Sequence, residues 1–385
     1  MKISENIKYI GVNDSKISLF EGQYKVENGM AYNSYLISDE KIAVLDTVDA
    51  AFGNKWLENL KSALCGKSPD YLVVHHMEPD HSANIANFMN AYPQAKIVAS
   101  AKSFVMMKQF FGVDYKENGI TVSEGDTLDL GSHTLKFITA PMVHWPEVIM
   151  SFDSADGVLF SADAFGKFGV TDADEDWACE ARRYYFGIVG KYGAQVQAVL
   201  KKASALGIKT ICPLHGPVLT ENLGYYLNLY NIWSSYEPEE KGVAIAYASV
   251  YGNTKKAAEL LAEKLNKKGI KTALSDLCRC DIAEAVEDAF RYDRLVLASV
   301  TYNAGLFPCM RQFTEDLAER NYQNRTVAFI ENGSWAPTAA NAAEKVLSGL
   351  KNLKFAANRV SIKSALDETS SAQLDALAEE LSESI

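Results

Sequence analysis

The chain has 385 residues and is 48% hydrophobic, which is sufficient for two domains with separate cores. Its net charge of -11 argues against nucleic acid and anionic membrane surfaces as partners, because both attract basic patches. Residues 1–16 lack the apolar core of a signal peptide, and no later stretch approaches membrane-spanning length. The sequence therefore predicts a soluble, cytoplasmic protein.

Short β-rich runs dominate the first part of the chain. Runs with the composition of strands are residues 34–38, 42–45, 71–74, 97–100, 127–130, 134–139, 148–152 and 158–160. Helical segments at residues 55–64 and 195–206 interrupt them. This rhythm predicts an α/β domain with loops at many strand ends, where functional side chains are often placed.

The densest group of possible metal ligands follows the strand-like run 71–74. His76, Glu78, Asp80 and His81 share one tight turn. Imidazoles and carboxylates crowded together lose hydration and repel one another unless a cation offsets both effects. The turn therefore predicts a metal site, although a small rotation of it would leave His81 out of contact with the metal.

Three further candidates stand at strand ends elsewhere in this part of the chain. They are His144, Asp163 and His215, each placed shortly after a β-rich run. A rigid scaffold can bring such loops together, so we expect these side chains to converge with the turn at residues 76–81.

Other reactive residue types are predicted to be structural. His75 should face away from its neighbour His76 and pack beside the site or hydrogen-bond a neighbour. His133 should lie on the surface in a turn, and the acidic run 172–176 should be a solvated loop. No CxxC pair occurs, so the cysteines are predicted to be small buried apolar residues: Cys65, Cys179, Cys212, Cys278, Cys280 and Cys309.

The polar stretch 234–241, which contains Pro238, predicts a linker between domains 1–241 and 242–385. After it, strands and long helical segments alternate. The strand-like runs are residues 243–247, 272–274, 295–298, 327–330 and 360–362. This alternation predicts a doubly wound parallel sheet.

A phosphate-binding loop follows the first strand of the second domain. Ser249 and Thr254 supply hydroxyls, Gly252 allows close approach of the backbone, and a helix begins directly afterwards. The loop contains no basic residue, which fits a phosphate monoester and neither the nucleoside triphosphate loop nor the GxGxxG turn.

Two more loops are expected to flank a bound ring at the carboxyl ends of the strands. They follow the strand-like runs 295–298 and 327–330, and Tyr302 or Trp335 could stack on the ring face. The predicted cofactor-binding residues are Ser249, Val250, Tyr251, Gly252, Asn253, Thr254, Thr301, Tyr302, Asn303, Ala304, Gly305, Asn332, Gly333, Ser334 and Trp335. The strands and loops of residues 242–385 resemble flavodoxin, which implies FMN.

The first domain resembles the metallo-β-lactamase superfamily, which implies an αββα sandwich. The usual first motif of that superfamily is His-x-His-x-Asp-His, and Glu78 stands here in place of its second histidine. Three carboxylates, Glu78, Asp80 and Asp163, bring the charge of two divalent cations down to about +1. Imidazole and carboxylate ligands with an open position suit non-haem iron.

A lactamase-like domain followed by a flavodoxin-like domain resembles the flavodiiron protein family. The resemblance implies one iron held by His76, Glu78 and His144, a second held by Asp80, His81 and His215, and Asp163 bridging both. It also implies reduction of O2 to water, or of NO to N2O, with electrons passed from an external donor through FMN to the iron pair.

The same resemblance implies a head-to-tail homodimer or a dimer of dimers. A separate rubredoxin-like protein or a reduced deazaflavin is the expected donor, since the chain contains no CxxC pair. Tyr184, Tyr185 and Tyr192 belong to a segment that could cover the site, as proton donors or as ordinary packing residues. Alternatives are a primary NO reductase, a zinc hydrolase with an accessory flavodoxin domain, and a non-catalytic electron carrier or redox sensor.

Overall fold

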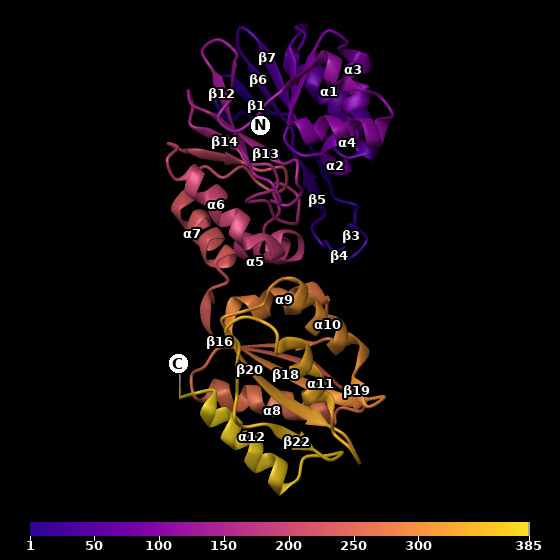
Figure 1. Cartoon of the computed structure of the whole chain (residues 1–385), viewed down its shortest axis with the longest axis vertical. Coiled ribbons are helices and arrows are strands. Elements are labelled where there is room, and N and C mark those ends of the chain that lie inside the picture. Colours follow the sequence, from indigo (N-terminus) through magenta and orange to yellow (C-terminus); the bar gives the residue numbers. More distant parts are fainter. Residues whose placement is uncertain (384–385) are drawn as a thin grey trace. The chain divides into compact units, whose positions relative to one another are not determined.

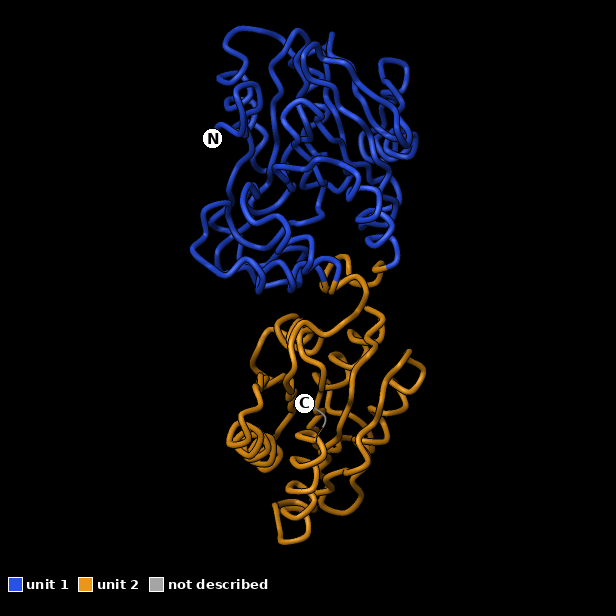
Figure 2. Tube along the Cα trace, turned by 90° about the vertical axis from the view of Figure 1, so that its left-hand side faces the viewer, with its two compact units in different colours: residues 1–185, 194–231 blue, residues 186–193, 232–385 orange. Residues whose placement is uncertain are grey.

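The computed structural model describes residues 1–383, which form two compact units. The first unit comprises residues 1–185 and 194–231, and the second comprises residues 186–193 and 232–385 (Figure 2). The chain changes unit at residues 231 and 232, so the domain boundary at residues 241 and 242 stays a prediction. The short segment 186–193 belongs to the second unit, although it lies between two stretches of the first in sequence.

The first unit contains two main sheets. One has the strand order β1-β6-β7-β8-β9-β10 and the other has the order β11-β12-β13-β14-β15. The strands of the first are β1 Ile7–Tyr9, β6 Tyr35–Ser38, β7 Ile42–Leu45, β8 Tyr71–Val74, β9 Lys96–Ala99 and β10 Gly119–Thr121. Those of the second are β11 Thr127–Asp129, β12 Thr134–Thr139, β13 Ile149–Asp153, β14 Val158–Phe160 and β15 Thr210–Cys212.

The two sheets enclose a shared apolar core. Leu45, Val73 and Val98 of the first sheet belong to the same buried cluster as Phe137 and Phe160 of the second. Residues Leu45 and Val73 are direct partners in the parallel pairing of β7 with β8, so these central strands are apolar throughout because both of their faces are covered.

Helices cover the outer faces and complete the predicted αββα sandwich. In Figure 1, α1, α3 and α4 lie beside the first sheet, and α6 and α7 lie beside the second. The helices are α1 Gly53–Leu64, α2 Pro79–Ser82, α3 Ile85–Ala91, α4 Ala101–Phe111, α5 Trp177–Tyr184, α6 Gly193–Ala203 and α7 Leu223–Ser234. Two small ribbons pair β2 Val12–Asp14 with β5 Met30–Tyr32 and β3 Leu19–Phe20 with β4 Tyr24–Lys25.

The second unit is the predicted doubly wound sheet. Its parallel strands follow the order β17-β16-β18-β20-β22, so the order reverses at β16. Strands are β16 Glu240–Ala248, β17 Thr272–Asp276, β18 Tyr292–Tyr302, β19 Gly305–Leu306, β20 Thr326–Asn332, β21 Lys354–Phe355 and β22 Val360–Ile362. A reversal of this kind opens a crevice at the carboxyl ends of the strands.

Helices cover both faces of this sheet. α8 and α12 share one buried core with the sheet, and α9, α10 and α11 lie on the opposite face (Figure 1). Their bounds are α8 Asn253–Lys267, α9 Ile282–Arg291, α10 Pro308–Glu319, α11 Ala339–Leu347 and α12 Glu368–Glu380.

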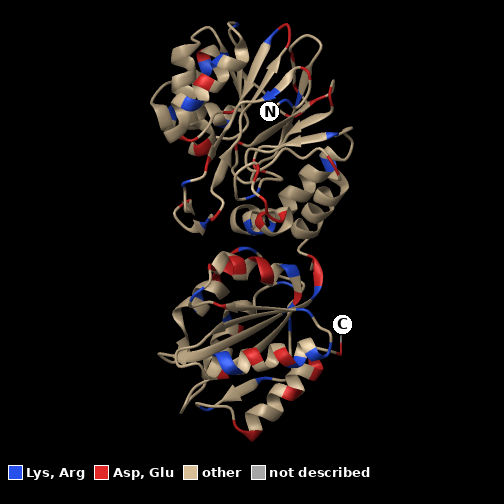
Figure 3. Cartoon of the chain, turned by 180° about the vertical axis from the view of Figure 1, so that it is seen from behind, with Lys and Arg blue, Asp and Glu red and all other residues tan. Residues whose placement is uncertain are grey.

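Charged residues of both signs alternate along the helices of the second unit (Figure 3). Lys264 pairs with Asp375 at 2.5 Å and Lys268 pairs with Glu379 at 2.8 Å, so two such pairs join α8 to α12. Among residues 1–383, no helix is both long and apolar enough to cross a membrane.

Candidate functional site

The turn after β8 is shaped to present several ligating side chains on one side. Glu78 precedes α2, and Pro79 occupies its first turn, where a missing N–H has no cost. The hydroxyl of Ser82 donates to the carbonyl of Met77 at 2.8 Å and closes the turn. The short helix thereby places Asp80 and His81 directly beside the residues that precede it.

His76, Glu78, His144 and Asp163 form a first cluster. His144 Nε2 lies 3.0 Å from Glu78 Oε2 and 3.1 Å from Asp163 Oδ2. His76 Nε2 lies 3.3 Å from both Glu78 Oε2 and His144 Nε2. The predicted residues of this set are therefore brought together from the ends of three different strands.

Asp80, His81 and His215 form a second cluster. His81 Nε2 lies 3.0 Å from His215 Nε2 and 3.4 Å from Asp80 Oδ2, and His215 Nε2 lies 3.3 Å from Asp80 Oδ2. His81, whose contact with the metal the sequence left open, points its ring into this cluster and is fully buried.

Asp163 lies between the two clusters and turns one oxygen to each. Its Oδ2 is 3.1 Å from His144 Nε2, and its Oδ1 is 3.2 Å from His81 Nε2. The absence of a side chain at Gly166 allows Asp163 and His215 to lie this close. A Cβ at residue 166 would be 2.9 Å from the Asp163 carbonyl oxygen and 3.3 Å from His215 Cβ. One carboxylate is thus held where it can bridge two ions.

The separations within each cluster fit a metal ion. Ligand atoms bound at about 2.1 Å around one ion are about 3.0–3.4 Å apart, for octahedral and tetrahedral angles respectively. The clusters show 3.0–3.4 Å between most of their facing atoms. Both oxygens of Asp80 and the Oδ1 of Asp163 are buried without any hydrogen bond. Uncompensated buried carboxylate oxygens indicate the place of a cation.

The pKa values also express this crowding. Burial raises the pKa of Asp80 to about 7, and the nearby charges of Glu78 and Asp163 add to the rise. Burial lowers the pKa of His215 to about 4, assisted by repulsion from His81. Burial likewise acts to lower the pKa of His144, but hydrogen bonds to Asp163 and Glu78 outweigh it and raise that pKa to about 9. Metal ions would resolve these conflicts, because the histidines can then be neutral and the carboxylates ionised.

A second layer of hydrogen bonds orients two of the imidazoles. His76 Nδ1 donates to Glu147 Oε1 at 2.8 Å, and the same oxygen accepts from the Met77 amide at 2.9 Å. His215 Nδ1 donates to the Ala31 carbonyl at 2.7 Å. Each bond fixes the tautomer and leaves Nε2 free to face the cluster. Glu147, which lies only three residues after His144, is not among the site residues predicted from sequence.

His75 behaves as predicted. Its ring lies outside both clusters, where Nδ1 donates to Asp46 Oδ2 at 2.5 Å and Nε2 accepts from the Ser151 hydroxyl at 2.8 Å. His75 therefore supports the turn that carries the clusters, and the prediction of a hydrogen-bonded neighbour is confirmed.

Two predictions about reactive residues were wrong. His133 is buried and not on the surface, because its Nδ1 donates to Asp153 at 3.1 Å and its Nε2 accepts from Asn6 at 3.0 Å. Of the cysteines, only Cys212 is buried, and Cys65 and Cys278 are exposed. Composition alone cannot place a small residue inside or outside when it stands in a loop or at a helix end.

Aromatic side chains and a hairpin cover the second cluster. The Phe20 and Tyr184 rings lie 5.6 Å and 5.5 Å from the His215 ring. Tyr184 is buried, and burial together with the charge of Asp163 raises its pKa well above the usual range. Tyr185 instead packs against Tyr230, at 5.3 Å. The predicted covering segment therefore reaches the site through Tyr184.

The open side of the site is acidic. The side chains of Glu78 and Asp80 are 15% and 10% exposed, whereas that of Asp163 is fully buried. Glu21, on the turn between β3 and β4, is close enough for Glu78 to influence it: burial, followed by the charge of Glu78, raises the pKa of Glu21 to about 7. Glu78 and Asp80 are therefore the most exposed members of the two clusters.

The second unit contains a separate cavity of about 620 Å³ at the carboxyl ends of its strands. It is lined by all three predicted loops, through Ser249, Val250, Tyr251, Asn253, Thr254, Thr301, Tyr302, Asn303, Ala304, Asn332, Gly333, Ser334 and Trp335. Gly252 and Gly305 belong to the same loops without lining the cavity; Gly252, with φ 90°, caps α8. This lining contains no charged residue, in agreement with the neutral phosphate loop predicted from sequence.

Hydrogen bonds between loops hold the walls of this cavity. The Thr301 hydroxyl accepts from the Thr338 amide at 2.9 Å, and Asn332 Nδ2 donates to the Ser364 carbonyl at 3.0 Å. Thr338 and Ser364, which are not among the predicted residues, line the cavity from the segments after β20 and β22. The Trp335 side chain is 91% exposed, a position suited to covering a flat ring.

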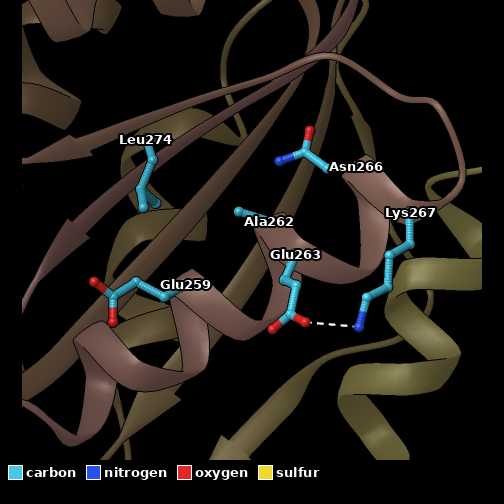
Figure 4. A pocket seen from close by; sticks show the side chains of 6 residues that line it. All are labelled: Glu259, Ala262, Glu263, Asn266, Lys267 and Leu274. Carbon is cyan, nitrogen blue, oxygen red and sulfur yellow. Dashed lines mark ion pairs between the residues drawn. The ribbon is translucent and has the colours of Figure 1, made fainter.

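A second depression of this unit lies between α8 and β17, away from the predicted loops. Glu259, Ala262, Glu263, Asn266, Lys267 and Leu274 line it (Figure 4). Its charged side chains are engaged in part with one another, as in the 2.6 Å pair of Lys267 with Glu263. It lacks the three converging loops that line the cavity at the carboxyl ends of the strands.

Known proteins resemble the chain over both halves. The family described as ODP family beta lactamase matches residues 30–216, and the flavodoxin domain matches residues 244–369. An uncharacterized protein of Methanocaldococcus jannaschii is 30% identical over 363 residues, covering 92% of this chain and 90% of that protein. The anaerobic nitric oxide reductase flavorubredoxin of Salmonella arizonae is 28% identical over 367 residues, covering 92% of this chain and 75% of that protein.

Among solved structures, the rubredoxin oxygen:oxidoreductase of Desulfovibrio gigas has a TM-score of 0.91 at 25% identity, covering 99% of this chain and 97% of that one. Fold and site thus define a two-domain redox protein in which a metallo-β-lactamase-like unit precedes a flavodoxin-like unit. The chain belongs to the flavodiiron protein family, whose members are oxidoreductases, as its sequence predicted. Its flavodoxin domain implies FMN, and its paired clusters fit two iron ions.

Proposed function

We propose that this protein reduces O2 to water with electrons that an external donor delivers through FMN to a non-haem diiron site. The observation that carries the proposal is Asp163, which turns Oδ2 to one three-residue set and Oδ1 to the other. The proposed ligands are His76, Glu78 and His144 for one iron, Asp80, His81 and His215 for the other, and Asp163 for both. Glu78 supports iron over zinc because it adds a third carboxylate to the pair.

The chemistry divides between the bound groups and the chain. When bound, iron and flavin together supply the electrons that a diatomic substrate accepts. The chain's own residues fix the geometry: Glu147 and the Ala31 carbonyl hold the His76 and His215 tautomers, and Asp163 keeps the two sets at one distance. Phe20 and Tyr184 exclude water on the side of His215, so substrate approaches from the side of Glu78 and Asp80.

The flavin cavity is proposed to hold FMN through neutral groups. Ser249 and Thr254 line it beside the amino end of α8, where hydroxyls and amide groups suit a phosphate monoester. Tyr302 and Trp335 line the same cavity and offer ring faces for stacking.

The remaining features of the function rest on family membership. We propose a cytoplasmic protein that accepts electrons from a rubredoxin-like protein or from reduced deazaflavin, and that assembles head to tail as a homodimer or a dimer of dimers. The rubredoxin donor is supported by the name of the Desulfovibrio gigas relative. Mixing with reduced rubredoxin or deazaflavin under anaerobic conditions, followed by flavin absorbance, tests the donor directly.

Elemental and flavin analysis of protein purified without air or added metal tests the proposal first. We expect about two irons and one FMN per chain, because Asp163 joins two ligand sets and the three predicted loops line one cavity. Zinc in place of iron, with hydrolytic turnover, would replace this function by that of a hydrolase with an accessory flavodoxin domain. If the protein contains iron and FMN but shows no turnover, the function would instead be that of an electron carrier or redox sensor.

Primary reduction of NO to N2O is the second candidate, favoured by the relative named an anaerobic nitric oxide reductase. Both substrates are diatomic and fit the same ligand set. The deciding measurement compares kcat/KM for O2 and NO on one preparation of known iron content.

A further inference from the structure

Two cysteines of the second unit bring their sulfurs together across 31 positions of sequence. Cys278 stands in the loop after β17, and Cys309 is the second residue of α10. Their Sγ atoms are 3.5 Å apart. Cys278 is exposed and Cys309 is partly buried, and neither lines the flavin cavity. Neither sulfur therefore has a role in the proposed function.

The backbone on both sides fixes these sulfurs in place. Asp276 accepts from the Cys278 amide through its side chain at 3.1 Å and from the Cys280 amide through its carbonyl at 2.8 Å. Cys309 follows Pro308 in the first turn of a 12-residue helix. A disulfide requires about 2.05 Å between sulfurs, so an approach of about 1.5 Å closes the bond. We propose that Cys278 and Cys309 are a reversible dithiol–disulfide pair that responds to small-molecule disulfides.

The chemistry proceeds by thiol–disulfide exchange. The exposed Cys278 thiolate attacks a small disulfide, RSSR, forming a mixed disulfide and releasing one RSH after protonation. The Cys309 sulfur, after losing its proton to solvent, attacks Cys278 Sγ and displaces the second RSH. The protein pair is oxidised by two electrons, and RSSR is reduced to two RSH. Excess small thiol reverses both steps.

The order of attack follows from the environments of the two thiols. Burial, followed by the neighbouring Cys278 thiol, raises the pKa of Cys309 to about 12. Cys309 therefore remains a thiol at neutral pH and acts second, when Cys278 is already activated as a mixed disulfide.

The pair lies one packing contact away from the flavin cavity. Phe307 is two residues before Cys309, and its ring lies 5.3 Å from that of Tyr302, which lines the cavity. Closing the bond ties the β17–α9 loop to the start of α10 and so restrains the loop that carries Phe307 and Tyr302. We expect the disulfide to slow the release of FMN.

The experiment treats the holoprotein with oxidised glutathione and maps its cysteines by differential alkylation and mass spectrometry. Cys278 and Cys309 should both become unavailable to the alkylating reagent, and digestion should yield a peptide that joins them within one chain. Cys278→Ser and Cys309→Ser should each abolish this peptide. Cys280→Ser is the matched control, because Cys280 stands in the same turn and should leave the peptide intact.

Flavin fluorescence supplies the second readout. Oxidised protein should release FMN at least about twofold more slowly than reduced protein. On heating, it should release FMN at a temperature about 5 °C higher. Cys278→Ser should show neither difference. A linked peptide without these differences would overturn the coupling to the cavity. Glutathione that stays on Cys278, a bond between two chains, or six unreacted thiols would overturn the pair itself.

Discussion

The metal site and the flavin cavity stabilise their contents by opposite means. Seven ionisable residues crowd the first, and six of them are buried. Three of their carboxylate oxygens, both of Asp80 and Oδ1 of Asp163, lack any hydrogen bond. The second is lined by uncharged loops, with Trp335 and Tyr251 almost fully exposed. A site of the first kind needs its cations to balance charge, whereas the lining of the second carries no charge to balance.

This contrast predicts that substitutions will act on one cofactor at a time. The largest effect is expected at Asp163, the only described carboxylate that faces both clusters. Asp163→Ala should lower the iron content toward zero and turnover more than about 100-fold, because both ions lose a shared charge. Elemental analysis and flavin absorbance on the same sample should show FMN unchanged.

Asp156→Ala is the control for that variant, since Asp156 belongs to the same unit but lies beside His133 and Asp153. It should retain iron. Full iron content in Asp163→Ala would remove the bridging role.

The next effect concerns orientation of a ligand. Glu147→Gln should weaken iron binding about 10- to 100-fold, because the His76 ring loses its charged acceptor. Dialysis against a graded chelator, with iron measured at each step, reports this affinity. Glu124→Gln changes an exposed carboxylate that pairs with Lys202, and this variant should lose iron at the same chelator concentrations as the unaltered protein. Equal chelator curves for the two variants would contradict the assignment of Glu147.

On the flavin side the expected effects are smaller, because many neutral contacts share the binding. Trp335→Ala should weaken FMN binding about 3- to 10-fold, the amount associated with one aromatic stacking contact. Fluorescence titration of deflavinated protein measures it, and iron content should not change. Leu274→Ala, in the depression of Figure 4, removes an apolar side chain of the same unit without approaching the cavity. A loss of iron with Trp335→Ala would break the proposed independence.

The smallest expected effect is on folding stability, at Glu380, a carboxylate that belongs to neither metal cluster. Glu380 accepts from the backbone amides of Ala357 and Asn358 at 2.7 Å and 2.8 Å. Burial opposes ionisation, but these bonds prevail and lower the pKa of Glu380. A lowered folded pKa contributes stability above the unfolded value of about 4.3, and this contribution disappears as pH falls through the folded pKa.

Glu380→Gln should therefore lower the unfolding free energy by at most about 1 kcal/mol at pH 7, since solvent screens the site. The difference from the unaltered protein should shrink in acid. Denaturant unfolding followed by flavin fluorescence measures both, with the exposed Glu383→Gln as control. A difference that grows toward low pH would have the wrong sign.

Local patterns accounted for much of the fold. β7, β8, β12, β14 and β22 have the predicted bounds, because β-branched and other apolar residues dominate each of them. β1 to β5, with two or three residues each, were missed. β6 was expected at residues 34–38 and lies at Tyr35–Ser38. The packing of segment 186–193 with the second unit left no local signal at all.

The sequence by itself determined which chemistry is present: a turn with two imidazoles and two carboxylates, and a neutral hydroxyl loop before a helix. Only the tertiary structure decided which ligands meet. Met142 and Ala162, both with positive φ, precede His144 and Asp163 and turn these residues toward one another at a backbone cost that only the surrounding packing can offset. The same holds for His133 and for Cys278 with Cys309, because contacts between residues far apart in sequence depend on how whole sheets and helices pack.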